Sequence, residues 1–90
     1  MDGLVSWPDD RGMDRTALEG FGENVRQARH EHGWTQEDLA ARTDLAVVQV
    51  SRIERGKREI RLTTLIRLLD GLDMPPDVLL KGLLQRPGAK

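Results

Sequence analysis

The chain has 90 residues, 38% of them hydrophobic, with 14 Lys and Arg against 15 Asp and Glu and a formal net charge of −1. This length suits one small domain, and the near-neutral charge excludes a protein that holds nucleic acid by bulk positive charge alone. The chain has no cysteine, which excludes a disulfide framework, a thiolate zinc site and a cysteine nucleophile, and it has neither an apolar run of roughly 20 residues nor a signal-peptide pattern, so we expect a cytoplasmic protein.

The sequence predicts an all-α fold of five helices. No proline occurs between Pro8 and Pro75, and straight-chain and charged residues dominate this stretch. No alternation of polar and apolar residues indicates a strand. We expect the helical domain to span residues 16–85, between a flexible acidic tail over residues 1–15 and a second flexible tail over residues 86–90.

The first predicted helix runs from about Ala17 to His32. Thr16 and Glu19 have the spacing of a capping box, in which two side chains accept hydrogen bonds from backbone N–H groups at a helix start. Gly33 follows the helix, and glycine accepts the left-handed conformation in which many helices end. The helix therefore has a signal at each end.

The second and third predicted helices, residues 36–43 and 47–55, form the most informative stretch of the chain. Two helices of about eight residues joined by three or four residues have the format of a helix-turn-helix. Thr35 and Asp38 give the second helix a capping-box start of its own, with Asp in place of the preferred Glu or Gln. This pair predicts where the unit begins.

The geometry of this unit makes demands that most of the residues meet. Ala40 is small enough for a close helix crossing, and Asp44 tolerates the positive φ of the turn better than most residues. Leu45 can fill the space beneath the turn, and Val50 anchors the second helix of the unit to the core. Ala46, in contrast, cannot cap the third helix, which costs about 1 kcal/mol.

The fourth and fifth predicted helices contain the remaining apolar residues. The fourth, residues 62–72, has five of them at helical spacing, which we expect to face the core: Leu62, Leu65, Ile66, Leu69 and Leu72. The fifth, residues 77–84, follows two prolines and has more apolar residues than one inward stripe needs. We predict that some of them form a homodimer interface: Val78, Leu80, Leu83 and Leu84. The alternative is a helix packed back on its own domain.

Two motifs, TQEDLA at residues 35–40 and IERGKR at residues 53–58, together resemble the Xre-type helix-turn-helix family that includes Cro and the phage repressors. The resemblance covers residues 20–84. It implies a five-helix, lambda-repressor-like domain that binds operator DNA as a symmetric dimer. The segments GWTQEDLA and RLTTLIRLLDGLDMP also resemble antitoxins of the HipB kind.

The resemblance to the Xre-type family implies a role for each of several residues. Gln36, at the start of the second helix, would donate to a DNA phosphate. The third helix would lie in the major groove and present four side chains to it: Val47, Val48, Gln49 and Arg52. Four basic residues beyond them would face the DNA backbone: Arg55, Lys57, Arg58 and Arg61. Residues 52–61 carry a local charge of +3, which the acidic residues 1–24 conceal in the total.

The residues at the reading positions depart from the usual polar pattern, because the third helix begins with Val47 and Val48. Valine cannot hydrogen-bond a base edge but can contact a thymine methyl group, whereas Arg52 suits guanine and Gln49 suits adenine. We expect sequence preference to depend on these contacts and on DNA shape. The valine pair could instead belong to a protein interface, and the basic stretch could be an ordinary solvated surface.

Other conspicuous residues have structural explanations. His30 and His32 point about 200° apart on a helix and do not converge on a metal ion, and we expect no metal and no cofactor. We expect Trp34 to pack in the core and Glu54 to orient neighbouring arginines. The sequence contains neither a nucleophile triad nor a phosphate-binding loop, so we do not expect an enzyme.

These observations predict a sequence-specific DNA-binding transcriptional regulator, a repressor, that acts as a homodimer on a two-fold operator in double-stranded DNA. Two alternatives stay open. One is an antitoxin that binds a toxin partner and autoregulates its operon, and the other is a protein-interaction module on the same fold.

Overall fold

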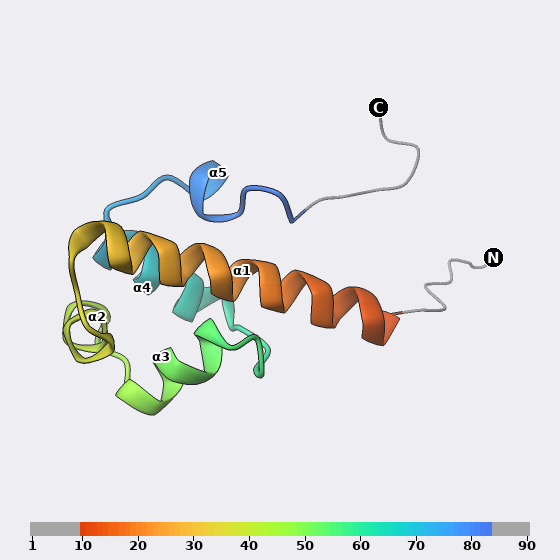
Figure 1. The fold of residues 1–90 in the computed structure, drawn as a ribbon, viewed down its shortest axis with the longest axis horizontal. Coiled ribbons are helices and arrows are strands. Elements are labelled where there is room, and N and C mark those ends of the chain that lie inside the picture. The colour runs from red at the N-terminus through yellow and green to blue at the C-terminus, as the bar shows by residue number, and fades with distance from the viewer. Residues whose placement is uncertain (1–9, 84–90) are drawn as a thin grey trace.

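The computed structural model describes the backbone of residues 10–83 and the side chains of residues 17–83. This part of the chain contains no strand, and its five helices, shown in Figure 1, are α1 Asp10–His32, α2 Gln36–Thr43, α3 Val47–Glu54, α4 Leu62–Leu72 and α5 Pro76–Leu79. The predicted all-α, five-helix fold is confirmed. None of these helices is both long enough and apolar enough to cross a membrane.

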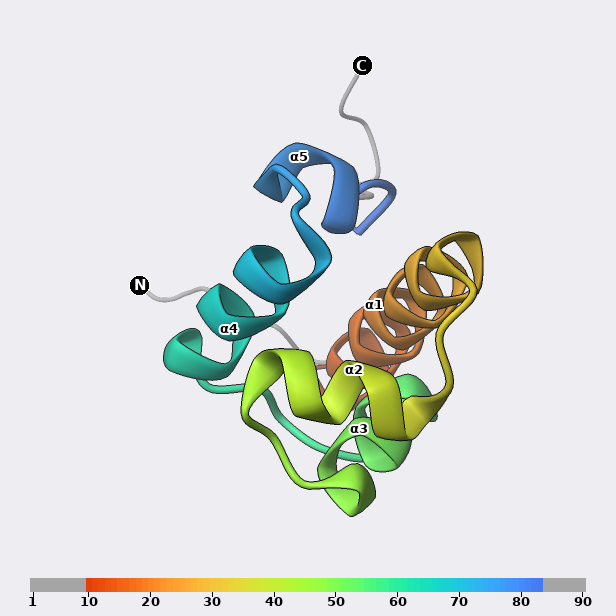
Figure 2. The ribbon, with the colours of Figure 1, turned by 90° about the vertical axis from the view of Figure 1, so that its left-hand side faces the viewer.

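The core lies between α1 and the four shorter helices. Figure 2 shows α2 and α3 at the bottom of the molecule, α5 at the top, and α1 and α4 on opposite sides. α1 packs against α3, and α2 packs against both α3 and α4. The largest fully buried side chains come from all five helices: Val25, Leu39, Val50, Leu68, Leu72 and Leu79. Burial of this apolar surface holds the helices together.

The start of α1 differs from the sequence prediction. The helix begins at Asp10, whereas a cap at Thr16 predicts a later start, so Thr16 lies inside the helix. Residues 10–15 contain no proline, and their single glycine costs only about 1 kcal/mol in a helix, so a helix already formed continues into them. Residues 1–9 and 84–90 lie outside the described residues, and the predicted tails and domain limits stay predictions.

α4 spans the predicted residues, and three of the five apolar residues expected to face the core pack in or against it as predicted: Leu65, Leu69 and Leu72. Leu68 and Leu72 are fully buried, whereas Leu62 and Ile66 are 70% and 55% exposed. The prediction that Leu62 and Ile66 face the core is therefore wrong. Residues two apart on a helix point about 200° apart, so the packing of α4 against α2 and α1 buries Leu68 and turns Ile66 to solvent.

α5 is a single turn, Pro76–Leu79, and the predicted length of this helix is wrong. Asn24 of α1 accounts for the early end, because its Nδ2 donates to the carbonyl oxygens of Leu79 and Lys81 at 2.8 and 3.0 Å. Both carbonyls would otherwise accept backbone bonds from a longer helix. Gly82 then adopts a left-handed conformation with φ of 83°.

Candidate nucleic-acid interface

The start of α2 is fixed by the capping box that the sequence predicts. The Thr35 hydroxyl accepts a hydrogen bond from the N–H of Asp38 at 3.0 Å, and Asp38 Oδ2 accepts one from the N–H of Thr35 at 2.9 Å. The hydrogen bonds from Thr35 favour the charged carboxylate and lower the pKa of Asp38 below its ordinary value of 3.8. The capping prediction is confirmed.

The turn between α2 and α3 is made by Asp44, which is left-handed with φ of 59° and ψ of 36°. The N–H groups of Asp44 and Leu45 both donate to the carbonyl oxygen of Ala40. Leu45 lies beneath the turn and is 8% exposed, and Ala40 and Val50 are buried between the helices. The turn therefore has the geometry that the sequence predicts for a helix-turn-helix.

α3 presents an apolar first turn and then a basic side chain to solvent. Val47 and Val48 are 38% and 52% exposed, whereas Val50 and Ile53 on the other side of α3 are buried. Arg52 is exposed and lies four residues after Val48, so these two side chains share a face of the helix. Three of the four predicted reading residues are thus on the solvent side of α3.

Gln49 lies on the same helix, but its amide oxygen is already engaged. Its Oε1 accepts a hydrogen bond from the N–H of Ala46 at 3.0 Å. Ala46 is the N-cap residue of α3 and has no side-chain acceptor. Gln49 therefore supplies half of a capping box from within the helix. The cap that the sequence lacks at Ala46 is replaced in part by a residue assigned to base reading.

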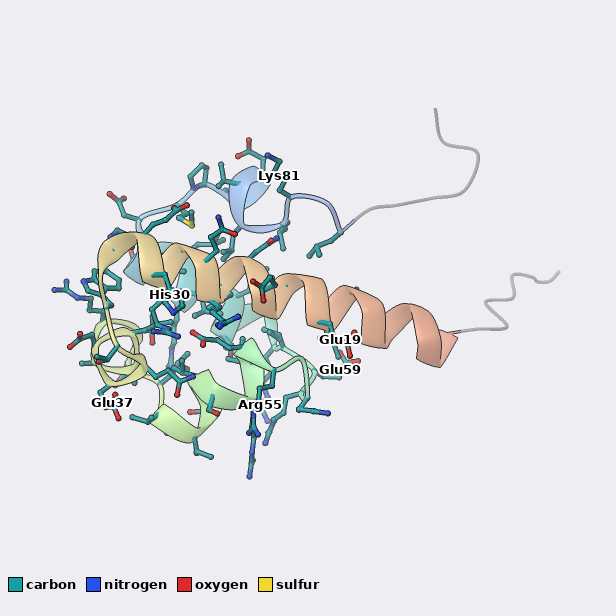
Figure 3. All side chains as sticks on the ribbon, in the orientation of Figure 1. Glu19, His30, Glu37, Arg55, Glu59 and Lys81 are labelled. Carbon is teal, nitrogen blue, oxygen red and sulfur yellow. The ribbon has the colours of Figure 1, made fainter. Side chains whose placement is uncertain are left out.

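The segment after α3 exposes the four residues that we predict to face the DNA backbone: Arg55, Lys57, Arg58 and Arg61. Figure 3 shows nitrogen-tipped side chains, Arg55 among them, extending from this side of the molecule away from α1. Arg55 Nε donates to the carbonyl oxygen of Ser51 at 3.3 Å. Within residues 17–83, no carboxylate forms an ion pair with any of these four residues or with Arg52.

Gln36, the predicted phosphate contact, is half-buried at the start of α2. Its Nε2 donates to Glu54 Oε1 at 3.1 Å. An amide nitrogen carries two hydrogens, and among the described residues Nε2 makes no second hydrogen bond. One hydrogen of Gln36 therefore holds the start of α2 to the end of α3, and the other can donate to a ligand.

Glu54 also forms an ion pair with Arg29 of α1. Arg29 Nε and Nη2 donate to the two carboxylate oxygens at 2.6 and 3.0 Å, and the two side chains are 10% and 3% exposed. The hydrogen bond to Glu54 raises the pKa of Arg29. Arg29 Nη1 donates to the carbonyl oxygen of Trp34 at 2.8 Å. The sequence predicts an orienting role for Glu54 but gives no signal for Arg29 as its partner.

His32 and Trp34 pack together next to this ion pair. Their rings stack with centroids 4.0 Å apart, and His32 Nε2 is 3.0 Å from the carbonyl oxygen of Leu72. Arg42 lies over the Trp34 ring at 4.3 Å. Trp34 packs against the core as predicted. Within the described residues, no group of three His, Asp or Glu side chains could hold a metal ion.

Of the residues predicted for a dimer interface, the three that the structure describes do not share one exposed face. Val78 is 43% exposed, whereas Leu80 and Leu83 are half-buried and pack against the core. Leu84 lies outside the described residues. Of the four residues, the structure therefore leaves Val78 as an exposed apolar side chain.

A larger exposed apolar surface lies on α4. It contains two exposed large apolar residues one helical turn apart, which we call the apolar face: Leu62 and Ile66. Ile66 also lines a shallow groove, together with the half-buried Leu69 and Met74. The sequence prediction missed this surface because it placed Leu62 and Ile66 in the core.

Three features define a helix-turn-helix DNA-binding domain: a capped α2, a left-handed turn, and an α3 whose outer face is exposed next to basic residues. The family model described as Helix-turn-helix (HTH_3) matches residues 25–79, so the chain belongs to this family of transcription regulators. The resemblance of the sequence to the Xre-type family is confirmed.

The sequence of this chain is similar to part of two HTH-type transcriptional regulators. The HTH-type transcriptional repressor RghR of Bacillus subtilis (strain 168) is 33% identical over 72 residues, which are 79% of this chain and 50% of RghR. The HTH-type transcriptional regulator Rv0023 of Mycobacterium tuberculosis (strain ATCC 25618 / H37Rv) is 34% identical over 58 residues, which are 64% of this chain and 23% of Rv0023. The matched region thus spans half or less of these relatives.

Solved structures of restriction-modification controller proteins have the same fold. C.AhdI from Aeromonas hydrophila matches with a TM-score of 0.69 and 34% identity over 71% of this chain and 97% of its own. The C.Esp1396I tetramer in complex with its natural 35 base-pair operator matches with a TM-score of 0.68 and 31% identity over 74% of this chain and 88% of its own. The fold of this chain is therefore also that of a protein whose structure has been solved in complex with operator DNA.

Proposed function

We propose that this chain acts as a homodimer that binds a two-fold operator and represses transcription, with α3 in the major groove. The observation that carries the proposal is the outer face of α3 with the basic segment behind it, where no described carboxylate neutralises the arginines and the lysine. The repressor role is supported by the name of RghR, and operator binding is supported by the complex of C.Esp1396I.

We assign the basic residues two different tasks. Arg52, on the face of α3, reads a guanine through its two parallel donors. The residues after α3 contact phosphates and set affinity without regard to sequence: Arg55, Lys57, Arg58 and Arg61. Gln36 adds a phosphate contact through the amide hydrogen that Glu54 does not use.

We also propose that the apolar face mediates dimerisation. Leu62 and Ile66 are the most exposed large apolar side chains among the described residues, and a small domain gains stability when such a surface is covered by a second copy. A two-fold dimer would place its two α3 helices about 34 Å apart, which matches half-sites one DNA turn apart.

The experiment is a selection of preferred duplexes from random DNA, followed by affinity measurements on the selected sequence at several salt concentrations. Arg52→Ala should cost about 1–3 kcal/mol and relax the preference at one base pair, whereas Lys57→Ala should weaken all sequences alike and reduce the salt slope by about 1. Arg26→Ala, an exposed arginine of α1, is the control and should leave both properties unchanged. Failure to enrich any sequence would contradict the proposal.

A further inference from the structure

The first turn of α3 exposes methyl groups, and its one side chain that can hydrogen-bond, Gln49, has its amide oxygen engaged at the helix start. Val47 and Val48 are its exposed side chains, and Ala46 before them is exposed as well. Gln49 is the one residue of α3 with an amide side chain. Its oxygen lies 3.0 Å from the N–H of Ala46, so it faces the helix start.

The hydrogen bond of Gln49 limits what this residue can read. Recognition of adenine uses the amide oxygen and nitrogen together, because the oxygen accepts from N6 and the nitrogen donates to N7. A Gln49 side chain that swings outward to do this breaks its bond to Ala46. Since Ala46 has no side-chain acceptor, α3 would then lose its side-chain cap altogether. Capping and adenine recognition therefore compete for the same oxygen.

We propose that the first turn of α3 recognises the 5-methyl group of a pyrimidine through Val47 and Val48, and that Gln49 is the cap that positions this turn. This inference rests on the proposed function. The methyl group of thymine lies in the major groove, and 5-methylcytosine carries the same group on the same ring carbon. Valine forms no hydrogen bond with the O4 of thymine or with the amino group of cytosine. The contact therefore accepts thymine and 5-methylcytosine alike.

The first test uses the full chain and synthetic duplexes of the selected sequence, with each thymine replaced in turn by uracil, which lacks the methyl group. We expect an affinity loss of about fourfold at one or two positions per half-site, the value of one buried methyl group. Cytosine at such a position, paired with guanine, should bind about fourfold more weakly than 5-methylcytosine in the same duplex. The two duplexes differ only in this methyl group, so the ratio of their affinities measures its contribution to binding.

The outcomes separate this inference from the proposed function. If uracil is neutral at every position, methyl recognition is wrong while operator binding stands. If no duplex is preferred over random DNA, operator binding fails and methyl recognition fails with it.

Variants of the protein assign the contact to α3. The penalty for uracil should shrink in Val47→Ala or in Val48→Ala, because alanine has fewer methyl groups, and should stay unchanged in Ser51→Ala, a half-buried position on the same helix. An unchanged penalty in both valine variants would overturn the assignment to the first turn.

The role of Gln49 is tested by Gln49→Met, which keeps the length of the side chain and removes its acceptor. We expect a lower melting temperature, a smaller uracil penalty and the same preferred bases. Adding Ala46→Ser supplies a new cap and should restore both the melting temperature and the uracil penalty. Loss of a preference for adenine at one position in Gln49→Met would show that Gln49 reads a base and would overturn its role as a cap.

Discussion

Arg29 and Glu54 lie 25 residues apart in the chain and form a two-bond ion pair that is nearly closed to solvent. Removal of two charges from water is costly, and the pair offsets that cost through its own bonds and through those to Trp34 and Gln36. The loss of one partner leaves the other charge buried without compensation. The pair is therefore more sensitive to single than to double replacement.

Glu54→Leu should lower the free energy of unfolding by about 3–5 kcal/mol because it strands the Arg29 charge. The double variant Arg29→Met with Glu54→Leu should recover a large part of this loss, since two apolar side chains then pack where the ions were. Urea unfolding followed by circular dichroism measures both. Glu23→Ala, at an ion pair whose side chains are 52% and 62% exposed, is the control and should change stability by less than about 1 kcal/mol.

Asp38 should make stability depend on pH in the acidic range. Its pKa is lowered in the folded protein from 3.8, so its charge stabilises the fold above the unfolded pKa, and this contribution is lost as the pH falls through the folded pKa. Wild type should therefore melt at a higher temperature than Asp38→Asn near neutral pH, and the difference should shrink as the pH drops below 3.8. A difference that stays constant on acidification would mean that the cap does not depend on the charge.

Ala46→Ser should stabilise the protein by about 0.5–1 kcal/mol, because it gives α3 the side-chain acceptor that its N-cap residue lacks. In a domain of this size that corresponds to a rise in melting temperature of about 2–8 °C. Ala41→Ser, at an exposed position inside α2, introduces the same side chain where no cap is needed. A similar rise in both variants would attribute the gain to something other than capping.

Gly71→Ala should destabilise the contact between α4 and α2. A Cβ atom at Gly71 would lie 2.6 Å from Thr43 Cγ2 and 2.9 Å from the carbonyl oxygen of Arg42. The resulting overpacking should cost about 1–3 kcal/mol, although alanine is the better helix former. Gly20→Ala is a matched control, because its Cβ meets only the end of the Leu83 side chain. Equal effects in thermal unfolding would contradict a role for close approach at Gly71.

Ile66→Glu should weaken self-association, because it places a charge in the apolar face. Sedimentation at micromolar concentration, with and without DNA, should show dimers of the wild type and a larger monomer fraction of the variant. Thr63→Glu, at an exposed position of α4, adds the same charge outside the apolar face. A wild-type protein that stays monomeric even on DNA would contradict the dimer.

Short-range signals in the sequence predicted the helix-turn-helix well. The capping box of Thr35 and Asp38 and the left-handed turn at Asp44 depend on atoms only a few residues apart, so their geometry follows from residue type and spacing. The limits of α2 and the start of α3 follow from the same signals. The fold class and the placement of the candidate site could therefore be predicted.

The features that could not be predicted depend on partners distant in sequence. The rotation of α4, which exposes Ile66, is set by its packing against α2 and α1. The early end of α5 depends on Asn24, which is 55 residues before Leu79. Glu54 pairs with Arg29 of α1, 25 residues earlier in the chain, and no local sequence pattern predicts this ion pair.

Glu54 accepts hydrogen bonds from Gln36 and Arg29 on the inner side of α3, away from its exposed outer face. These bonds fasten the start of α2 and the end of α3 to α1, while Val48 and Arg52 face solvent. Under the function proposed above, exchange of such outward-facing residues changes the recognised sequence without loosening the attachment of α3. A few substitutions on the outer face of α3 would then produce regulators of different operators on the same helical scaffold, whether they arise in evolution or by design.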